Sequence, residues 1–224
     1  MPRPAVIFDV DGTLVDTNWF HTVSWWRTFQ KAAHDIPMSR IHPLIGMGSG
    51  QLVGELVGDG NDDLTDGHGK EFEAFMDEIV AFPRAGDLLR ALHERDVKVA
   101  LATSSQEAHL RPMLDAIAAD DAIDEIVNAD DVDRSKPDPD IFGAALEKLG
   151  NPPSDATLVI GDTRWDIEAA QRAGLRTACV LTGGNARHDL DAAGAVAVFE
   201  DVAQILASLD DSDGPVSRLL RQDD

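Results

Sequence analysis

The chain has 224 residues, of which 43% are hydrophobic and 27% charged. This composition is typical of one folded domain, with or without a small insertion. Its 41 acidic and 19 basic residues give a formal net charge of −22, a field that repels nucleic acids and anionic membranes. We therefore expect neither a nucleic acid nor a membrane as a partner. We expect the protein to be a monomer or homodimer. The single cysteine, Cys179, excludes an internal disulfide, and the apolar run after Pro4 is too short for a signal peptide, so we expect a cytoplasmic protein.

Short β-branched runs alternate with helix-length segments along most of the chain. The runs cover residues 5–8, 97–102, 157–160, 178–181 and 195–199, and segments with apolar residues three and four apart cover 85–95, 107–118, 139–149 and 166–173. Continuous apolar runs suit strands covered on both faces, and their alternation with helices is typical of parallel sheets. We therefore predict an α/β fold with a Rossmann-like parallel sheet.

The interval between the first two predicted strands is far longer than the roughly 30 residues of a whole βαβ unit. Its apolar spacing predicts three helices, with faces made by Trp19, Phe20, Val23, Trp26, Phe29 and Ala33, by Leu52, Val53, Leu56 and Val57, and by Phe72, Phe75, Met76, Ile79 and Val80. The acidic segment 59–70 is interpreted as a solvated connection. We predict a core of residues 1–15 and 84–224 and an inserted α-helical cap domain of residues 16–83. Hinges are expected at residues 14–16 and 81–84, and a frayed, partly disordered tail at 210–224.

Polar side chains follow the first two predicted strands. Asp9 and Asp11 follow the first in the motif Asp-Val-Asp-Gly-Thr, which ends at Thr13, and Thr103 and Ser104 follow the second. Open parallel sheets build their sites at the carboxyl ends of the strands. Hydroxyls just before a helix can hold an anion together with the helix N–H groups, although helix capping alone would explain one of them.

Two later motifs complete the set. Lys136 lies in Ser-Lys-Pro-Asp-Pro. Taken alone, this motif is more simply interpreted as containing an isolated surface lysine. Asp162 and Asp166 lie in Gly-Asp-Thr-Arg-Trp-Asp, at the end of another predicted strand, and helix capping would account for either acid but not for the whole arrangement. If these strands are parallel, all four motifs reach one edge of the sheet and form one site.

In this order the four motifs resemble those of the haloacid dehalogenase superfamily, specifically its phosphatase branch with a helical cap, which is phosphoglycolate phosphatase-like and β-phosphoglucomutase-like. The resemblance covers residues 5–209. It implies that Asp9 is the nucleophile that forms an aspartyl phosphate. It implies that Asp11 protonates the leaving oxygen and later activates water.

The resemblance also implies a magnesium ion, which prefers oxygen ligands. Those ligands would be Asp9, the main-chain carbonyl of Asp11, Asp162, and Asp166 directly or through a water. Thr103 and Lys136 are the other implied catalytic residues: Thr103 would hold phosphoryl oxygens, and Lys136 would offset the repulsion between Asp9 and the phosphate. Thr13 and Ser104 are implied to contact the substrate.

Three functions remain open at this point. The first is a magnesium-dependent phosphatase acting on a small phosphorylated metabolite, with phosphoglycolate or a sugar phosphate as the expected substrate. The second is a phosphomutase of the β-phosphoglucomutase type, because the segment 16–21, with His21, also resembles the region after the first motif in those enzymes. The third is a catalytically silent metal- or phosphate-binding module. Asp11 and Asp162 argue against a dehalogenase, because that enzyme type lacks the second aspartate and the metal site.

Recognition of the leaving group is expected from the cap. His21, Arg40 and the glycine-rich turn around Gly46 are the cap residues we expect to face the site. Arg40 would suit a short acidic substrate such as phosphoglycolate, whereas His21 would suit the hydroxyl groups of a sugar phosphate. The sequence does not choose between the two.

Overall fold

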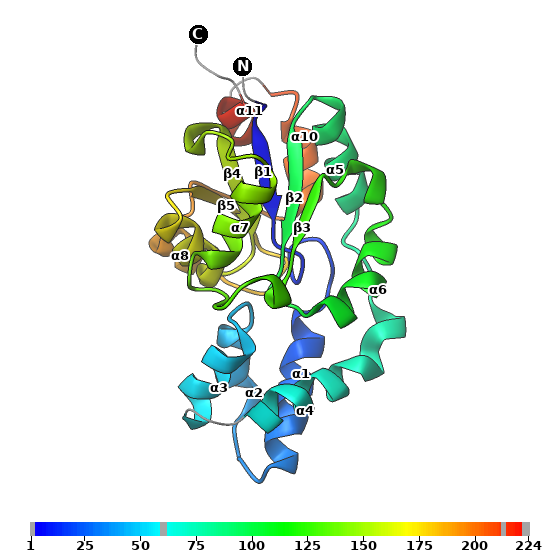
Figure 1. Cartoon of the computed structure of the whole chain (residues 1–224), viewed down its shortest axis with the longest axis vertical. Coiled ribbons are helices and arrows are strands. Elements are labelled where there is room, and N and C mark those ends of the chain that lie inside the picture. The colour runs from blue at the N-terminus through cyan, green and yellow to red at the C-terminus, as the bar shows by residue number, and fades with distance from the viewer. Residues whose placement is uncertain (1–2, 59–61, 212–213, 221–224) are drawn as a thin grey trace.

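In the computed structural model, which describes residues 3–58, 62–211 and 214–220, six parallel strands form one sheet (Figure 1). The strands are β1 (Ala5–Phe8), β2 (Lys98–Ala102), β3 (Glu125–Val127), β4 (Thr157–Gly161), β5 (Arg176–Val180) and β6 (Ala197–Phe199). Their order is β3-β2-β1-β4-β5-β6, so β1 lies between β2 and β4. The predicted Rossmann-like parallel sheet is confirmed. The sequence analysis missed β3, because it has only three residues and begins with a glutamate.

The two faces of the sheet are buried under different helices. The core helices are α5 (Ala85–Glu94), α6 (Glu107–Ile117), α7 (Asp140–Lys148), α8 (Arg164–Arg172), α9 (Arg187–Ala193), α10 (Val202–Ser208) and α11 (Pro215–Leu220). Within β1, Val6 and Phe8 pack with apolar residues of α5, α6 and α10. Ala5 and Ile7 pack on the other face with residues of α7 and α8. Side chains that alternate between two covered faces explain why every residue of β1 is apolar.

The inserted residues form helices at the carboxyl end of the strands, apart from the sheet (Figure 1). They are α1 (Asn18–Lys31), α2 (Met38–Ile41), α3 (Ser49–Val57) and α4 (Asp62–Phe72), with 3₁₀ turns at His42–Leu44 and Glu73–Glu78. Their apolar cluster contains Trp25, Phe29, Ile41, Leu52 and Leu64. The domain boundaries at residues 15/16 and 83/84 stay a prediction.

The prediction for the acidic segment and the third cap helix was wrong. Most of residues 59–70 are helical in α4, residues 59–61 lie outside the described part, and the expected helix from Phe72 onward is a 3₁₀ turn. Tertiary packing overrides the low helix propensity of glycine here. Gly67 lies so close to α1 that a Cβ would be 2.9 Å from Thr28 Cγ2.

The predicted apolar face of α1 was also wrong. Of the residues assigned to that face, only Phe29 is fully buried, and Trp19 is 54% exposed. The buried side of α1 is largely polar and includes Asn18, His21 and Thr22. The helix is rotated so that these polar groups face the sheet edge and α4.

The two chain crossings between sheet and cap are joined to each other. The N–H of Asp16 donates to the carbonyl of Val80 at 3.0 Å, and the N–H of Phe82 donates to the carbonyl of Leu14 at 2.9 Å. Val15 and Ala81 form an antiparallel bridge between these bonds. Any movement of the cap about these residues would therefore bend a paired ribbon, and their role as hinges stays a prediction.

The carboxyl-terminal segment differs from the expected frayed tail. Residues 215–220 form α11, and Val216 is 1% exposed in the main core. The rest of the predicted tail includes residues 212–213 and 221–224, which lie outside the described part. Among the described residues, no helix combines the length and apolar character needed to cross a membrane.

Leu158 in the central strand β4 tests this account of the core. It is fully buried, so Leu158→Ala should lower the free energy of unfolding by about 3 kcal/mol through lost burial and the cavity left behind. Val196, which is 47% exposed, provides the matched control, because Val196→Ala should change stability by less than about 0.5 kcal/mol. Chemical denaturation of the three proteins measures both effects, and equal losses would contradict the assigned burial.

Candidate active site

Asp9 lies immediately after β1, where the sheet order turns. Phe8 pairs with Leu101 on one side and with Ile160 on the other, and the N–H of Asp9 donates to the carbonyl of Ile160 at 2.8 Å. Asp9 is therefore fixed between β2 and β4 at the topological switch point of the sheet, where open α/β folds bind ligands. Only 4% of its surface is exposed.

Lys136 is fully buried beside Asp9. Its Nζ donates to Asp9 Oδ1 and to the carbonyl of Ala102 at 3.0 Å, and it lies 2.8 Å from Asp166 Oδ1. Burial lowers the pKa of Lys136, but Asp166 and Asp9 more than offset this and hold the pKa above its ordinary value. Lys136 is therefore a fixed positive charge between two carboxylates, not the surface lysine that its motif alone would suggest.

Asp162 and Asp166 both follow β4. Asp162 Oδ2 accepts from Asn18 Nδ2 at 2.7 Å, and Oδ1 accepts from Thr13 Oγ1 at 3.2 Å. Asp166 caps α8, because its Oδ2 accepts from the N–H of Thr163 at 3.0 Å and from Thr163 Oγ1 at 2.6 Å. The capping interpretation of Asp166 is thus correct, but its other oxygen faces Lys136.

Carboxylate oxygens of Asp9, Asp162 and Asp166 all lie within 4.8 Å of one another. Burial raises the pKa of Asp162 well above its ordinary value, and the charges of Asp166 and Asp9 add to this. Burial likewise raises the pKa of Asp9, with Lys136 opposing and Asp166 and Asp11 reinforcing the shift. Three buried carboxylates share one lysine, so ionisation of all three would leave more negative charge than the protein itself balances, and burial and mutual repulsion oppose it.

Two glycines make room for Asp162. Gly12 has φ +76°, and a Cβ there would lie 2.3 Å from Asn18 Nδ2 and 2.5 Å from Asp162 Oδ2. A Cβ at Gly183 would lie 1.7 Å from Asp162 Oδ2. The glycine of the first motif is therefore required by both conformation and space, and Gly183 is a site residue that the sequence analysis missed.

Asp11 has a different environment from Asp9. Its Oδ1 accepts from Thr17 Oγ1 at 2.6 Å and lies 3.0 Å from His21 Nε2, while its Oδ2 accepts from Thr103 Oγ1 at 3.0 Å and Ser105 Oγ at 2.8 Å. Burial raises the pKa of Asp11, but the charge of His21 and the hydrogen bonds more than offset this and lower the pKa below its ordinary value. Asp11 is ionised, whereas burial and repulsion oppose ionisation of Asp9.

Two cap helices supply a stack of rings behind Asp11. His21 Nδ1, on α1, lies 3.1 Å from His68 Nε2, on α4. The His21 ring stacks on Phe72 with centroids 4.0 Å apart, and His68 stacks on Trp25 at 4.2 Å. The predicted site residue His21 therefore reaches Asp11, while its partner His68 was missed because it lies in the segment interpreted as a loop.

A cavity of about 50 Å³ lies between the core and the cap, and Asp9 and Asp11 belong to its lining. The cap contributes His21, Trp25, Ile45, Gly46, Met47, Ser49, Leu52, Thr65 and His68 to its lining, and the core contributes Ser104, Ser105, Gln106 and His109. The predicted residues His21, Gly46 and Ser104 therefore line one cavity together with Asp9 and Asp11. Arg40 is exposed on α2 and is not part of this lining, so its contact with a substrate stays a prediction without structural support.

The cap touches the core directly around this cavity. Ser104 Oγ donates to the carbonyl of Gly46 at 3.2 Å, and the N–H of Gly48 donates to the carbonyl of Lys136 at 3.0 Å. A Cβ at Gly46, where φ is +97°, would lie 2.9 Å from Thr163 Oγ1. The turn predicted from its glycines thus lies against the loop that carries Lys136 and against Thr163, which precedes α8.

The donor set fits a hard divalent cation. Buried carboxylates with an unbalanced negative charge and only oxygen donors suit Mg²⁺. The side chain of Asp11 has four other partners and is not part of the cluster, so only its main-chain carbonyl is left as a metal ligand. Assignment of the ion to Asp9, Asp11, Asp162 and Asp166 stays a prediction.

The chain matches a known family over most of its length. The family model described as haloacid dehalogenase-like hydrolase matches residues 6–180. A protein named phosphoglycolate phosphatase from Rhodospirillum rubrum is 30% identical over 219 residues, which is 92% of this chain and 90% of the relative. A protein named pyrophosphatase PpaX from Oceanobacillus iheyensis is 27% identical, over 93% of this chain and 97% of the relative.

Solved structures agree with this assignment. A hydrolase from Pseudomonas syringae superposes with a TM-score of 0.87 at 35% identity, over 93% of this chain and 99% of the other. CbbY from Rhodobacter sphaeroides, solved in complex with phosphate, superposes with a TM-score of 0.74 at 26% identity, over 93% of this chain and 96% of the other. The chain belongs to the haloacid dehalogenase-like hydrolases, as its motifs predicted, and is an enzyme of the type that acts on phosphate esters.

The charge imbalance of the carboxylate cluster makes a testable prediction. Asp162→Asn removes one buried carboxyl group whose ionisation is unfavourable, and the amide can still accept from Asn18 and donate to Thr13. Without metal, this variant should melt about 2–4 °C higher than the wild type. Mg²⁺ should raise the melting temperature of the wild type but not of the variant, because binding to the folded state alone stabilises it.

Thermal melts with Mg²⁺ and with a chelator measure both effects. Asp155→Asn, at an exposed position, is the matched control and should keep the full response to Mg²⁺. An Asp162→Asn protein that responds to Mg²⁺ like the wild type would contradict the assignment of Asp162 as a ligand.

Proposed function

We propose that this protein is a magnesium-dependent phosphatase that hydrolyses a small phosphomonoester through an aspartyl phosphate on Asp9. Phosphoglycolate, from the names of two relatives, and sugar phosphates are the first substrates to test. The observation that carries the proposal is the pair of environments: Asp9 lies against Lys136 and two carboxylates, while Asp11, two residues on, accepts four hydrogen bonds. Two carboxylates in such different surroundings suit two different roles.

In the first step, an Asp9 carboxylate oxygen attacks phosphorus, and the bond from phosphorus to the leaving oxygen breaks. Lys136 offsets the repulsion between the Asp9 carboxylate and the phosphoryl group. A bound Mg²⁺ would supply further charge neutralisation at the same oxygens. In the second step, water attacks phosphorus, and the Asp9 carboxylate and inorganic phosphate are released.

Asp11 is suited to move the protons in both steps. As an ionised carboxylate it can accept a proton from the attacking water in the second step. In the first step the leaving oxygen needs a proton, which an ionised Asp11 does not carry. Of the four groups that contact Asp11, the imidazole of His21 is the one whose type serves as a general acid, whereas the other three are aliphatic hydroxyls. We therefore assign proton delivery to the Asp11–His21 pair, 3.0 Å apart.

Asp9→Asn tests the nucleophile. The amide preserves the shape of the side chain but is a poor nucleophile, so kcat for 4-nitrophenyl phosphate with Mg²⁺ should fall by about 10³-fold or more. Asp124→Asn changes the net charge equally, away from the cavity lining, and should keep the wild-type rate per folded molecule. Activity that survives both Asp9→Asn and exhaustive chelation would contradict this mechanism.

His21→Gln tests the proton pair. Glutamine can still donate a hydrogen bond to Asp11 but cannot release a proton. Hydrolysis of an alkyl phosphate, whose leaving oxygen needs protonation, should slow by about 10²-fold. Hydrolysis of 4-nitrophenyl phosphate, whose leaving group departs as an anion, should slow by about threefold or less, and equal losses on both esters would show that His21 serves only the structure.

The phosphomutase remains the alternative within the family. It requires that the aspartyl phosphate outlive the exchange of one sugar hydroxyl for another in the closed site. We expect glucose 1-phosphate to release phosphate faster than it yields glucose 6-phosphate, and the opposite ratio would favour the mutase.

A further inference from the structure

The cavity that must hold the leaving group has no permanent cation on its cap side. Its cap lining is apolar at Trp25, Ile45, Met47 and Leu52 and uncharged at Ser49 and Thr65. Among the described residues of that lining, there is neither a lysine nor an arginine. The segment 59–61, which is not described, reads Asp-Gly-Asn and contains no basic residue.

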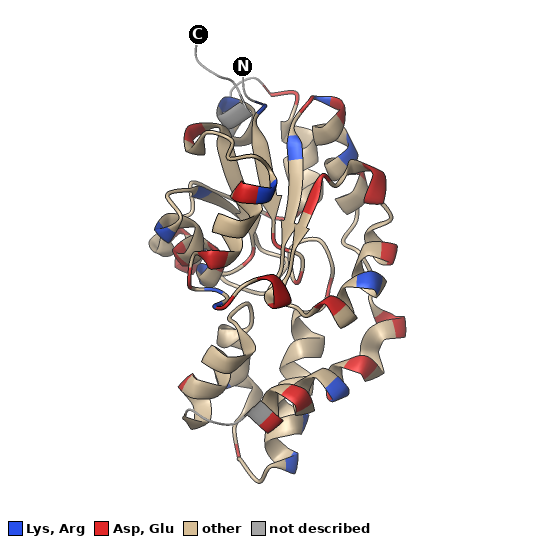
Figure 2. Cartoon of the chain, viewed as in Figure 1, with Lys and Arg blue, Asp and Glu red and all other residues tan. Residues whose placement is uncertain are grey.

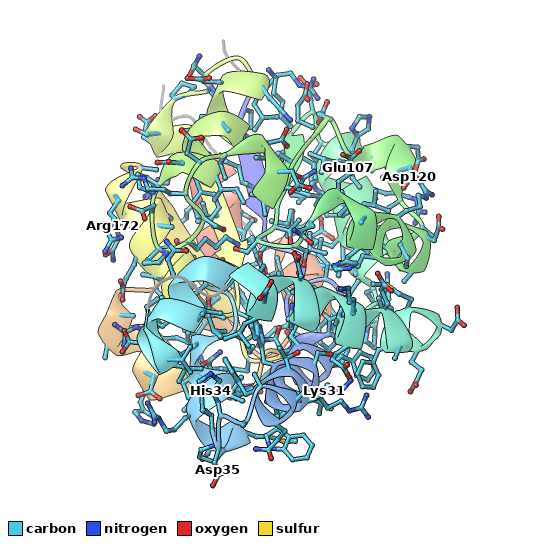
Figure 3. The ribbon with its side chains drawn as sticks, turned by 60° about the horizontal axis from the view of Figure 1, so that its bottom comes forward. Lys31, His34, Asp35, Glu107, Asp120 and Arg172 are labelled. Atoms are coloured by element: carbon cyan, nitrogen blue, oxygen red, sulfur yellow. The ribbon has the colours of Figure 1, made fainter. Side chains whose placement is uncertain are left out.

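All four basic residues of segment 16–83 are accounted for elsewhere. Arg27 lies over the ring of Phe75, 5.2 Å from its centroid, and Lys31 pairs with Glu71. Arg40 and Lys70 are exposed. Figure 3 shows Lys31 at the outer end of the cap, near His34 and Asp35, and Figure 2 shows how few basic segments the cap carries.

The histidines of the lining do not replace a cation. Burial holds the pKa of His68 well below its ordinary value, and the neighbouring charges of His21 and His109 add to this. The pKa of His109 is also lowered, mainly by burial. His21 is already engaged with Asp11 and His68. The imidazoles of His68 and His109 are therefore neutral groups that can hydrogen-bond to hydroxyls or amides.

A second negative charge on the substrate would lie in an unfavourable field. The carboxyl groups of Asp9 and Asp11 line the same cavity, and the phosphoryl group is itself an anion. A carboxylate on the leaving group would lose its hydration on entering the cavity and would meet no lysine or arginine among the described residues of the lining, while His21 is already paired with Asp11. A hydroxyl, an amide or an apolar group would meet no such penalty.

Resting on the proposed function, we infer that the substrate is a phosphomonoester whose leaving group is uncharged, and that phosphoglycolate is a poor substrate. The specificity follows from the described side chains that surround the leaving group on the cap side of the cavity, which are apolar or hydrogen-bonding and include no lysine or arginine. The leaving group is therefore an alcohol or polyol without a carboxylate.

A matched pair of esters tests this inference. Phosphoglycolate and its neutral amide, phosphoglycolamide, have nearly the same shape and differ by one charge. With the Mg²⁺-loaded wild-type enzyme, kcat/KM for the amide should exceed that for phosphoglycolate by at least tenfold. A wild type that hydrolyses phosphoglycolate as well as the amide, or better, overturns the inference and leaves the proposed function standing.

A cation placed in the lining separates recognition from intrinsic reactivity. Met47 is half-buried and lines the cavity, and lysine has nearly the length of methionine. Met47→Lys should therefore shift the ratio of kcat/KM for the two esters by about tenfold or more in favour of phosphoglycolate. Ser39→Lys adds the same charge at an exposed cap position outside the lining and should leave the ratio unchanged. Thr65→Lys, on α4, carries the same test if Met47→Lys does not fold.

The remaining outcomes are also decisive. If Met47→Lys and Thr65→Lys both fold and neither changes the ratio of kcat/KM for the two esters, the inference is overturned, because the lining would then not discriminate by the charge of the leaving group. No hydrolysis of 4-nitrophenyl phosphate or of either ester with Mg²⁺ overturns the proposed function, and the inference with it.

Discussion

The contact between Lys136 and the two carboxylates of Asp9 and Asp166 is the interaction on which the site depends. A fully buried lysine is costly unless its charge is paired, and here the paired groups come from β1 and from the start of α8. The carbonyl of Lys136 also accepts a bond from Gly48 of the cap. One side chain thus joins the sheet edge to the carboxylate cluster, while its backbone joins that edge to the cap.

The same contact explains why Asp9 and Asp11 differ. Asp9 shares Lys136 with other acids, and the cluster has unbalanced charge that a divalent cation would neutralise. Asp11 instead contacts hydrogen-bonding groups of both cap and core: the Thr17 hydroxyl and the His21 imidazole of the cap, and the hydroxyls of Thr103 and Ser105 of the core. Its ionised state therefore depends on the cap being in contact with the core.

The sequence predicted most of the polar groups that the strands of the sheet bring together, and fewer of those that the cap contributes. Asp9, Thr103, Lys136 and Asp162 were found because each follows a buried apolar run or lies in a distinctive motif, and parallel strands bring such groups together. α4 and His68 were missed because two glycines lower helix propensity there, and the close approach of Gly67 to α1 is visible only in the structure. The buried face of α1 was misassigned for a related reason. This face packs against polar groups of the site, so its own residues are largely polar and the spacing of apolar residues does not indicate it.

Trapping the covalent intermediate tests the central claim most directly. Rapid quenching during turnover with Mg²⁺, reduction with borohydride and peptide mass spectrometry would convert an acyl phosphate into homoserine at the modified position. The account predicts this conversion at Asp9 and its absence at Asp11, Asp162 and Asp166. Turnover without any modification of Asp9, or with modification of another residue, would contradict it.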